Sequence, residues 1–414
     1  MTDEPARPSA ASAHPARPLA TVLLFAALIV CLSMGIRHTM GLFLAPLTQE
    51  HQWSREVFSL AIAVQNLAWG VCQPFAGLLA DRFGARRVLW TGAALYALGL
   101  AGMAWSATGT GLAASAGLLI GMAQSGTTYS VVFAAMGRLV PQARLSWAMG
   151  LVGAAGSFGQ FLMVPVAAGL IEGMGWFGTL VVFALAALLM VPLGASLTRG
   201  LTPAAAHAGQ SAKAALHEAT GDRSFQLLAL GFFVCGFQVV FIGVHLPAYL
   251  LDKGLSANVG MTALALIGLF NIVGTYGYGH LGSRFPKRML LASIYFLRSI
   301  GVTVFLLAPL TPLTVYLFAA FIGLLWLSTV PLTNAIVGHI FGMRYFGMLS
   351  GFVFFSHQVG SFLGVWLGGK LFDATGSYDL VWGIVIALGV IAAIAHLPID
   401  ERSMAQRGAH QPAR

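Results

Sequence analysis

The feature that most constrains this chain is a series of apolar runs, each long enough to cross a lipid bilayer as a helix. A spanning helix needs roughly 20 apolar residues, because the hydrocarbon layer is about 30 Å thick. Lipid offers the backbone no hydrogen-bond partners, so runs of this length are expected to be helical. They are bounded by charges, proline or glycine, and they cover residues 20–45, 57–79, 88–107, 110–136, 146–171, 177–196, 224–250, 258–281, 289–308, 313–338, 346–370 and 380–398. The sequence therefore predicts an all-α membrane protein with twelve transmembrane helices.

The composition agrees with this class. Only 8% of the residues are charged, whereas charged residues make up about 25% of a typical soluble domain. The formal net charge of +9 does not indicate a nucleic-acid partner, because the basic residues lie in short loops between apolar runs. Cys31, Cys72 and Cys235 lie inside apolar runs without disulfide or metal spacing. We expect them to be packing residues, and we expect no metal and no cofactor.

The twelve runs form two sets of six that repeat one another. Residues 77–87 and 279–288 are related by an offset of 202, and the segments around them align without a gap from Gly41 to Arg86. A second match, at an offset of 201, pairs Gly150, Gly159, Glu172 and Gly175 with Gly351, Gly360, Asp373 and Gly376. The predicted domains are a disordered cytoplasmic tail (1–19), an N-terminal six-helix half (20–197), a cytoplasmic linker (198–223), a C-terminal six-helix half (224–398) and a cytoplasmic tail (399–414).

The distribution of basic residues predicts the orientation. If the N-terminus is cytoplasmic, 17 Lys and Arg residues lie on the inside, against Arg55, Lys253 and Lys370 on the outside. Only Arg37 and Arg298 remain, both within spans. An excess of Lys and Arg marks the cytoplasmic side. We therefore expect both termini in the cytoplasm and the chain in the cell inner (plasma) membrane.

The loop between the second and third spans carries a charged motif. Gly77 lets a neighbouring helix approach, Gly84 permits a tight turn, and negative charge at Asp81 is favoured near a helix N-terminus. The motif, Gly77-x-Leu79-x-Asp81-Arg82-x-Gly84-x-Arg86-Arg87, resembles the signature loop of the major facilitator superfamily. The resemblance implies two six-helix halves related by a pseudo-two-fold axis and substrate binding between them.

The same resemblance implies a gate. The loop would bridge the halves on the cytoplasmic side in one state and release them in the other. Its alternative reading is a set of arginines that only anchor the topology. The candidate gating residues are Gly77, Asp81, Arg82, Gly84, Arg86 and Arg87, with Arg284 and Arg288 in the second copy.

Three further stretches resemble the monocarboxylate-transporter-like branch of this superfamily, which also holds oxalate–formate exchangers. They are residues 37–43, 52–55 and 148–160. The resemblance implies a small organic anion as substrate. One departure weakens it, because the eighth span has no Arg or Lys and offers Asn271, Thr275 and Tyr276 instead. The arginine that many superfamily members place in the fourth span is also missing from residues 121–126.

Two arginines and three histidines are the ionisable groups expected within the membrane. A charge there costs about 2.5–3.5 kcal/mol on insertion scales, so each is a candidate for function. Arg37 suits bidentate capture of a carboxylate, with a structural bond to backbone carbonyls as the alternative. For Arg298, in the ninth span, a packing role is as plausible as ligand contact. His38, His245 and His357 could carry a coupling proton or serve as hydrogen-bonded structural groups.

Uncharged polar residues complete the candidate substrate site. About half of such groups are expected to bond helix to helix instead of touching substrate. They are Gln65, Asn66, Gln124, Tyr129, Gln160, Gln238, Asn271 and Asn334.

These features predict a secondary active transporter that works by alternating access and moves a small organic anion, such as a monocarboxylate, by proton symport or exchange. Its expected partners are the substrate, a coupling proton and the lipid bilayer, and we expect a monomer. The alternative is efflux of amphipathic compounds or drugs, because a cavity with few charges also suits apolar ligands. An enzyme is not expected, since no motif of catalytic residues is present.

The two copies of the charged loop differ, and the difference is testable. The second copy carries Ser283 where the first carries Asp81. Asp81→Asn is expected to impair transport and to shift the equilibrium between states, because it removes a contact worth about 0.3–1 kcal/mol. The matched control, Ser283→Ala, is expected to leave both nearly unchanged. Transport by reconstituted protein measures the difference, and equal effects at the two positions would reduce the loop to a topology signal.

Overall fold

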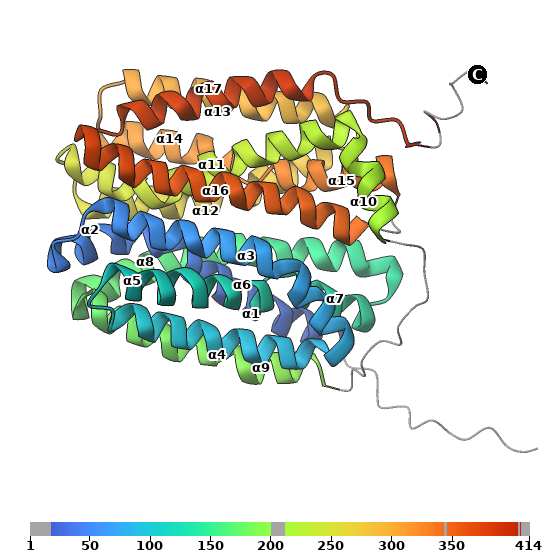
Figure 1. Ribbon diagram of the computed structural model, residues 1–414, viewed down its shortest axis with the longest axis horizontal. Helices are drawn as coiled ribbons and strands as arrows, with labels where there is room; N and C mark the ends of the chain where they lie inside the picture. The colour runs from blue at the N-terminus through green and yellow to red at the C-terminus, as the bar shows by residue number, and fades with distance from the viewer. Residues whose placement is uncertain (1–17, 200–211, 343–345, 405, 407–414) are drawn as a thin grey trace, which may run out of the picture.

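All regular elements of the described chain are helices, packed as a bundle (Figure 1). The computed structural model describes residues 18–199, 212–342, 346–404 and 406. The expectations for the N-terminal tail, the middle of the linker and most of the C-terminal tail fall outside these residues. The predicted all-α membrane fold is confirmed within them.

Eighteen helical elements follow one another along the chain. The N-terminal half contains α1 (Leu19–His38), α2 (Met40–His51), α3 (Arg55–Phe83), α4 (Ala85–Ala104), α5 (Gly109–Leu112), the π-helix η1 (Ala113–Leu119), α6 (Ile120–Thr127), α7 (Tyr129–Leu139), α8 (Gln142–Leu188) and α9 (Met190–Leu197). The C-terminal half contains α11 (Arg223–Asp252), α12 (Ala257–Leu281), α13 (Lys287–Leu307), α14 (Pro312–Leu325), α15 (Thr329–Phe341), α16 (Phe346–Thr375) and α17 (Asp379–His396). Between them, the predicted linker contains a short helix, α10 (Ala212–Gly221).

Each of the twelve predicted spans has a helical counterpart. Nine helical segments of the described chain are long and apolar enough to cross a bilayer. One of them, residues 148–197, contains two predicted spans, because α8 turns at Gly175, where φ is 74°. The remaining two spans correspond to α3 and to the interrupted path from α5 to α7.

Four spans are interrupted within their length, which the hydropathy pattern does not predict. In the sixth span, Leu189 separates α8 from α9. The first span breaks at Thr39 between α1 and α2, and the fourth at Thr128, which has extended backbone angles. The tenth span breaks at residues 326–328, between α14 and α15. A break leaves backbone carbonyls without helical partners. In lipid these carbonyls need partners from elsewhere in the protein.

The two halves meet along three pairs of helices. In Figure 1 the N-terminal half, coloured blue to green, lies below the C-terminal half, coloured yellow to red. Helix α3 packs against α16, α8 against α12, and α2 against α11. At four glycines a Cβ atom would collide with the other half: Gly41 meets Gly243, Gly70 meets Gln358, Gly268 meets Gln160, and Gly369 meets Ser59. The backbones of the two halves are therefore closely packed there.

Two helical turns further toward the charged loop at Gly84, the halves are apart. Residues seven apart share a helix face, so Gly77 continues the face of Gly70, and Gly351 continues the face of Gln358. No described atom lies within 4 Å of a Cβ built at either glycine. Gly150 and Gly153, on α8, are equally free. Among the described residues, the halves thus touch at the end predicted to be outside, and these glycines are uncovered toward the end predicted to be inside.

Candidate functional site

A small cavity lies where the two halves meet. It holds about 40 Å³, room for a few water molecules. Its polar lining comes from the N-terminal half and consists of Arg37, His38, Gln65, Asn66 and Gln160. The lining from the C-terminal half is apolar apart from the indole of Trp326. The cavity therefore has one polar wall and one apolar wall.

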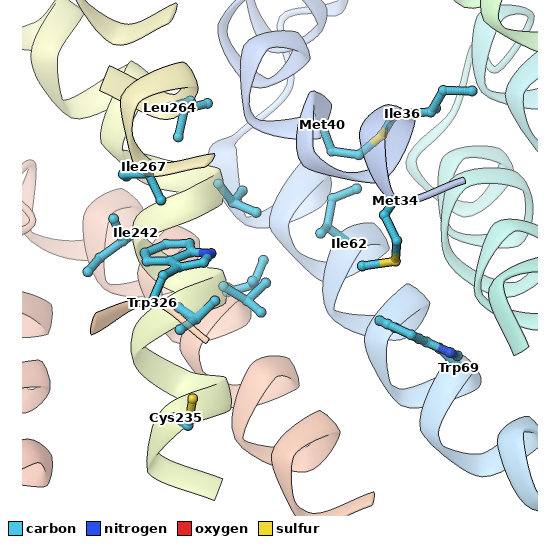
Figure 2. Packing of buried hydrophobic residues seen from close by; sticks show 14 of the residues in the cluster. Met34, Ile36, Met40, Ile62, Trp69, Cys235, Ile242, Leu264, Ile267 and Trp326 are labelled. Carbon is cyan, nitrogen blue, oxygen red and sulfur yellow. The ribbon is translucent and has the colours of Figure 1, made fainter. Parts of the chain in front are cut away.

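The apolar surroundings are visible in Figure 2. Trp326 lies beside Ile242 on the C-terminal side, and Met40 and Ile62 lie across the junction on the N-terminal side. The nitrogen of the Trp326 indole points toward the N-terminal half. This nitrogen is buried and has no hydrogen-bond partner among the described residues. A ligand or a water molecule in the cavity would satisfy it.

Arg37 supplies the positive charge of the cavity. It stands in the last turn of α1, just before the break at Thr39. Its Nη2 donates to Asn66 Oδ1 at 2.8 Å, its Nη1 donates to Gln124 Oε1 at 3.4 Å, and the guanidinium lies 4.5 Å from the centre of the Trp69 ring. All three partners are uncharged. A guanidinium has five N–H donors, so this one has donors to spare.

No carboxylate of the described residues neutralises Arg37. The ion pairs formed among the described residues are Arg55–Asp252 and Arg402–Asp400. A buried charge normally has an opposite charge as its partner, and a bound anion would provide one. The geometry of Arg37 thus favours the ligand role that the sequence suggested over a bond to carbonyls.

Three other polar groups of the cavity donate to backbone carbonyls. Gln65 donates to the carbonyl of Ala116, and Asn66 donates to the carbonyl of Ile62. Gln160 donates across the halves to the carbonyl of Leu264 at 3.3 Å. Its Oε1 is buried and has no donor among the described residues. The cavity therefore offers unused donors from Arg37 and Trp326 and an unused acceptor from Gln160.

Arg298 has a different environment, although it is also an arginine within a span. It is only 3% exposed. Its guanidinium donates to the carbonyls of Leu325 and Trp326, at the break of the tenth span, and to Gln238 Oε1. The carbonyl end of a helix attracts positive charge. This placement favours the packing role for Arg298, and its contact with substrate stays a prediction.

The remaining candidates lie away from the cavity lining. Asn271 bonds to Ser157 of the other half and to the backbone N–H of Leu327. Asn334 donates to its own helix at Val330. His357 bonds to Gln358 and stacks on Phe354. Tyr129 packs against Phe133. Their roles in binding remain sequence-based predictions.

The structure also contains an outer latch, a set of contacts between the halves at their closed end. Arg55, at the start of α3, makes two bonds of 2.6 Å to Asp252, at the end of α11. It also donates to the Tyr378 hydroxyl at 2.9 Å. The Asp373 carboxylate accepts the backbone N–H groups of Arg55 and Glu56, so α16 caps the N-terminus of α3. We define the outer latch as Arg55, Asp252, Asp373 and Tyr378.

The sequence did not single out these four residues as a site. In the sequence, Arg55 stands as an outside charge and Asp373 as part of the repeat. The available signal was that one base and two acids stand at the outer ends of spans in opposite halves. Burial raises the pKa of Tyr378 to about 12, so its phenol keeps its proton.

Each latch contact contributes only a small free energy. A partly exposed ion pair contributes about 0–1 kcal/mol, and a helix cap contributes about 1 kcal/mol. Moving a two-state equilibrium from 1:99 to 99:1 takes about 5.5 kcal/mol. A latch of this size biases the closed outer end without locking it.

His245 contacts the outer latch from within α11. It is fully buried. Its Nδ1 lies 3.1 Å from the Tyr378 hydroxyl, and its Nε2 lies 2.9 Å from the carbonyl oxygen of Val365. The sequence placed His245 on the substrate cavity, whereas the structure places it behind the latch.

The predicted cytoplasmic gate is described only in part. Gly84 has a φ of 88°, which fits the expected tight turn. Arg86 is exposed, with its guanidinium 4.3 Å from the centre of the Trp90 ring, and Arg87 is exposed as well. The side chains of Asp81 and Arg82 lie outside what the structure describes. In the second copy Arg284 is exposed, and Arg288 bonds to the carbonyls of Leu397 and Ile399 in its own half.

The comparisons with known proteins agree on one family. The Major Facilitator Superfamily (MFS) domain matches residues 23–364. The chain is 26% identical over 411 residues to the MFS-type transporter YcxA of Bacillus subtilis, covering 94% of this chain and 97% of that protein. It is 27% identical over 377 residues to monocarboxylate transporter 13 of Rattus norvegicus, with coverage of 88% and 86%. The MFS-type transporter YhjX of Escherichia coli is 24% identical over 349 residues, with coverage of 82% and 85%.

The contrast between the two arginines predicts unequal effects on stability. Arg298→Met leaves carbonyls at the break of the tenth span without donors, at about 1–3 kcal/mol for each unsatisfied group. We expect a melting temperature several degrees lower in detergent, while Arg37→Met changes it little. Arg402→Met, at the surface, is the control for loss of one charge. An unchanged melting temperature for Arg298→Met would show that its bonds to the break do not hold the fold.

Proposed function

Because the chain belongs to the major facilitator superfamily, we propose that it is a secondary active transporter that carries a small organic anion, such as a monocarboxylate, by proton symport or exchange. Transport through the membrane is the property of the family. The substrate class is our proposal, as are alternating access and the location in the plasma membrane with both termini in the cytoplasm. The last of these follows from the excess of Lys and Arg on one side.

The observation that carries the substrate class is the guanidinium of Arg37. It lies in a cavity between the halves, and none of its described partners is negatively charged. In major facilitator transporters substrates bind near the bilayer midplane between the halves. A carboxylate would neutralise the charge and accept two parallel N–H bonds. A relative named monocarboxylate transporter 13 supports the same substrate class.

The separation of the halves at one end supports alternating access. Gly77 and Gly351, on facing helices, have no described atom near them, whereas the outer latch closes the opposite end. This arrangement is the one expected of a transporter open to the inside. Rocking of one half against the other would then expose the cavity to the outside.

Efflux of amphipathic compounds is the second candidate, and one observation favours it. The C-terminal wall of the cavity is formed by Val239, Val240, Val244, Leu264 and Trp326. Such a wall suits an apolar ligand. The apolar wall alone, however, leaves the charge of Arg37 unexplained.

Substitution of Arg37 tests the anion proposal. Arg37→Gln keeps a polar side chain but removes the charge, and a hydrogen bond to a charged group is worth about 1.5–3 kcal/mol. We expect affinity for a bound carboxylate to fall about ten- to hundredfold. Ligand-induced stabilisation of the purified protein against a panel of carboxylates and amphipathic drugs measures this. Arg402→Gln is the charge-matched control, and equal stabilisation of parent and Arg37→Gln by carboxylates would contradict the proposal.

The unused groups on the cavity wall predict a preference among carboxylates. A hydroxyl beside the carboxylate can accept from Trp326 Nε1 and donate to Gln160 Oε1. A neutral hydrogen bond contributes about 0.5–1.5 kcal/mol, so 2-hydroxypropanoate should bind about two- to tenfold more tightly than propanoate. Trp326→Phe keeps an aromatic ring and removes the N–H, and it should reduce this ratio. A ratio that is equal in parent and Trp326→Phe would rule out the indole contact.

A further inference from the structure

The outer latch and His245 form one chain of hydrogen bonds between the halves. It runs from Asp252 through Arg55 to the Tyr378 hydroxyl, and then from His245 to the carbonyl of Val365. Only Arg55 belongs to the N-terminal half. The strength with which Tyr378 holds Arg55 therefore affects the contact between the halves.

The direction of each bond in this chain follows from its ends. The carbonyl of Val365 can only accept, so His245 Nε2 carries a hydrogen. Nδ1 of the neutral ring is then an acceptor, and the Tyr378 O–H donates to it. The phenol oxygen keeps its lone pairs for Arg55, whose Nη1 donates at 2.9 Å. With a neutral histidine, every donor in the chain has one acceptor.

A proton on Nδ1 of His245 would disrupt this order. Nδ1–H would have to donate to the phenol oxygen, and the Tyr378 O–H would have to turn away. The imidazolium and the Arg55 guanidinium would then donate to the same oxygen, which brings two positive charges close together. Like charges at this range repel inside a protein. Protonation of His245 thus weakens the closed latch.

The other charged groups around the latch bond to partners other than His245. Asp252 is held by both Nη atoms of Arg55, Asp373 is held by the N-terminus of α3, and Glu56 accepts from Trp366. Near the outer ends of these elements, the other charged residues are Lys253 just after α11, Lys370 on α16 and Asp379 at the start of α17, and the phenol of Tyr249 packs against Tyr378. Lys370 lies over the Trp366 ring.

We infer that His245 is a proton-binding site and that its protonation opens the outer latch. The inference rests on the proposed function in that it requires a transporter with alternating states. A proton that binds one state more tightly shifts the population toward that state. The closed latch excludes the proton, so acid favours the state open to the outside. Because the closed state excludes the proton, the midpoint is expected below about 6.5, the unperturbed pKa of histidine.

The distance between the outer ends of the halves tests this inference. In the full chain, with Cys31, Cys72 and Cys235 replaced by alanine, spin labels are placed at Gln49→Cys and Asn258→Cys, both at exposed positions in opposite halves. Distance distributions are recorded in lipid nanodiscs at about pH 8 and about pH 5.5, on either side of the histidine range. We expect the longer-distance population to grow at least twofold on acidification.

Variants separate His245 from other titrating groups. His245→Gln stays neutral and should lose the response to pH, whereas His280→Gln, at an exposed histidine, should keep it. Tyr378→Phe removes the shared hydroxyl and should raise the longer-distance population at both pH values. A response that survives in His245→Gln, or that is absent in the parent, would overturn the inference. If His245→Gln does not fold, the Tyr378→Phe result decides. A distance distribution of Tyr378→Phe equal to that of the parent at both pH values would refute the inference.

These distances are measured without substrate, so the result is independent of the substrate class. If the distances respond to pH but no carboxylate stabilises the protein, the inference about the latch stands and the proposal of an anionic substrate fails. Carboxylate binding without a pH response would retain the anion and reject the latch.

Discussion

In a bilayer, a polar group has no water to bond with, and the rest of this structure depends on how each such group is satisfied. Backbone groups are satisfied by helix formation, which explains why every regular element of the described chain is helical. Where a span breaks, its free carbonyls need donors. Arg298 supplies them at Leu325 and Trp326. Arg37, which is only partly buried, has only neutral partners and borders a cavity. Arg298 therefore completes the fold, whereas Arg37 keeps a charge that a substrate can neutralise.

The two ends of the bundle differ in the contacts that join the halves. The outer latch joins the halves through one ion pair, one phenol and one helix cap, each worth on the order of 1 kcal/mol. The inner end lacks comparable contacts at Gly77 and Gly351. Since alternating access requires states of similar free energy, a weak latch is more useful than a strong one. The cavity lies between these two ends.

Much of this architecture follows from the sequence because hydropathy and repetition are local signals. The spans, the two halves and the Arg37 cluster with His38, Gln65, Asn66 and Gln160 were predictable. The broken helices were not, because each break lies within an apolar run. The two arginines also look alike in sequence, since the carbonyls that bind Arg298 lie 27 residues away on another helix. The latch was missed because charges at helix ends resemble topology signals until the fold brings them together.

The central claim is that a carboxylate binds the guanidinium of Arg37, and solid-state NMR on reconstituted protein tests it most directly. A monocarboxylate labelled with ¹³C at its carboxyl carbon is bound to protein labelled with ¹⁵N at arginine, and dipolar dephasing reports their proximity. The account predicts dephasing by a guanidinium in the parent protein, retained in Arg298→Lys and lost in Arg37→Lys. Dephasing that persists in Arg37→Lys, or that is absent in the parent with ligand bound, would contradict it.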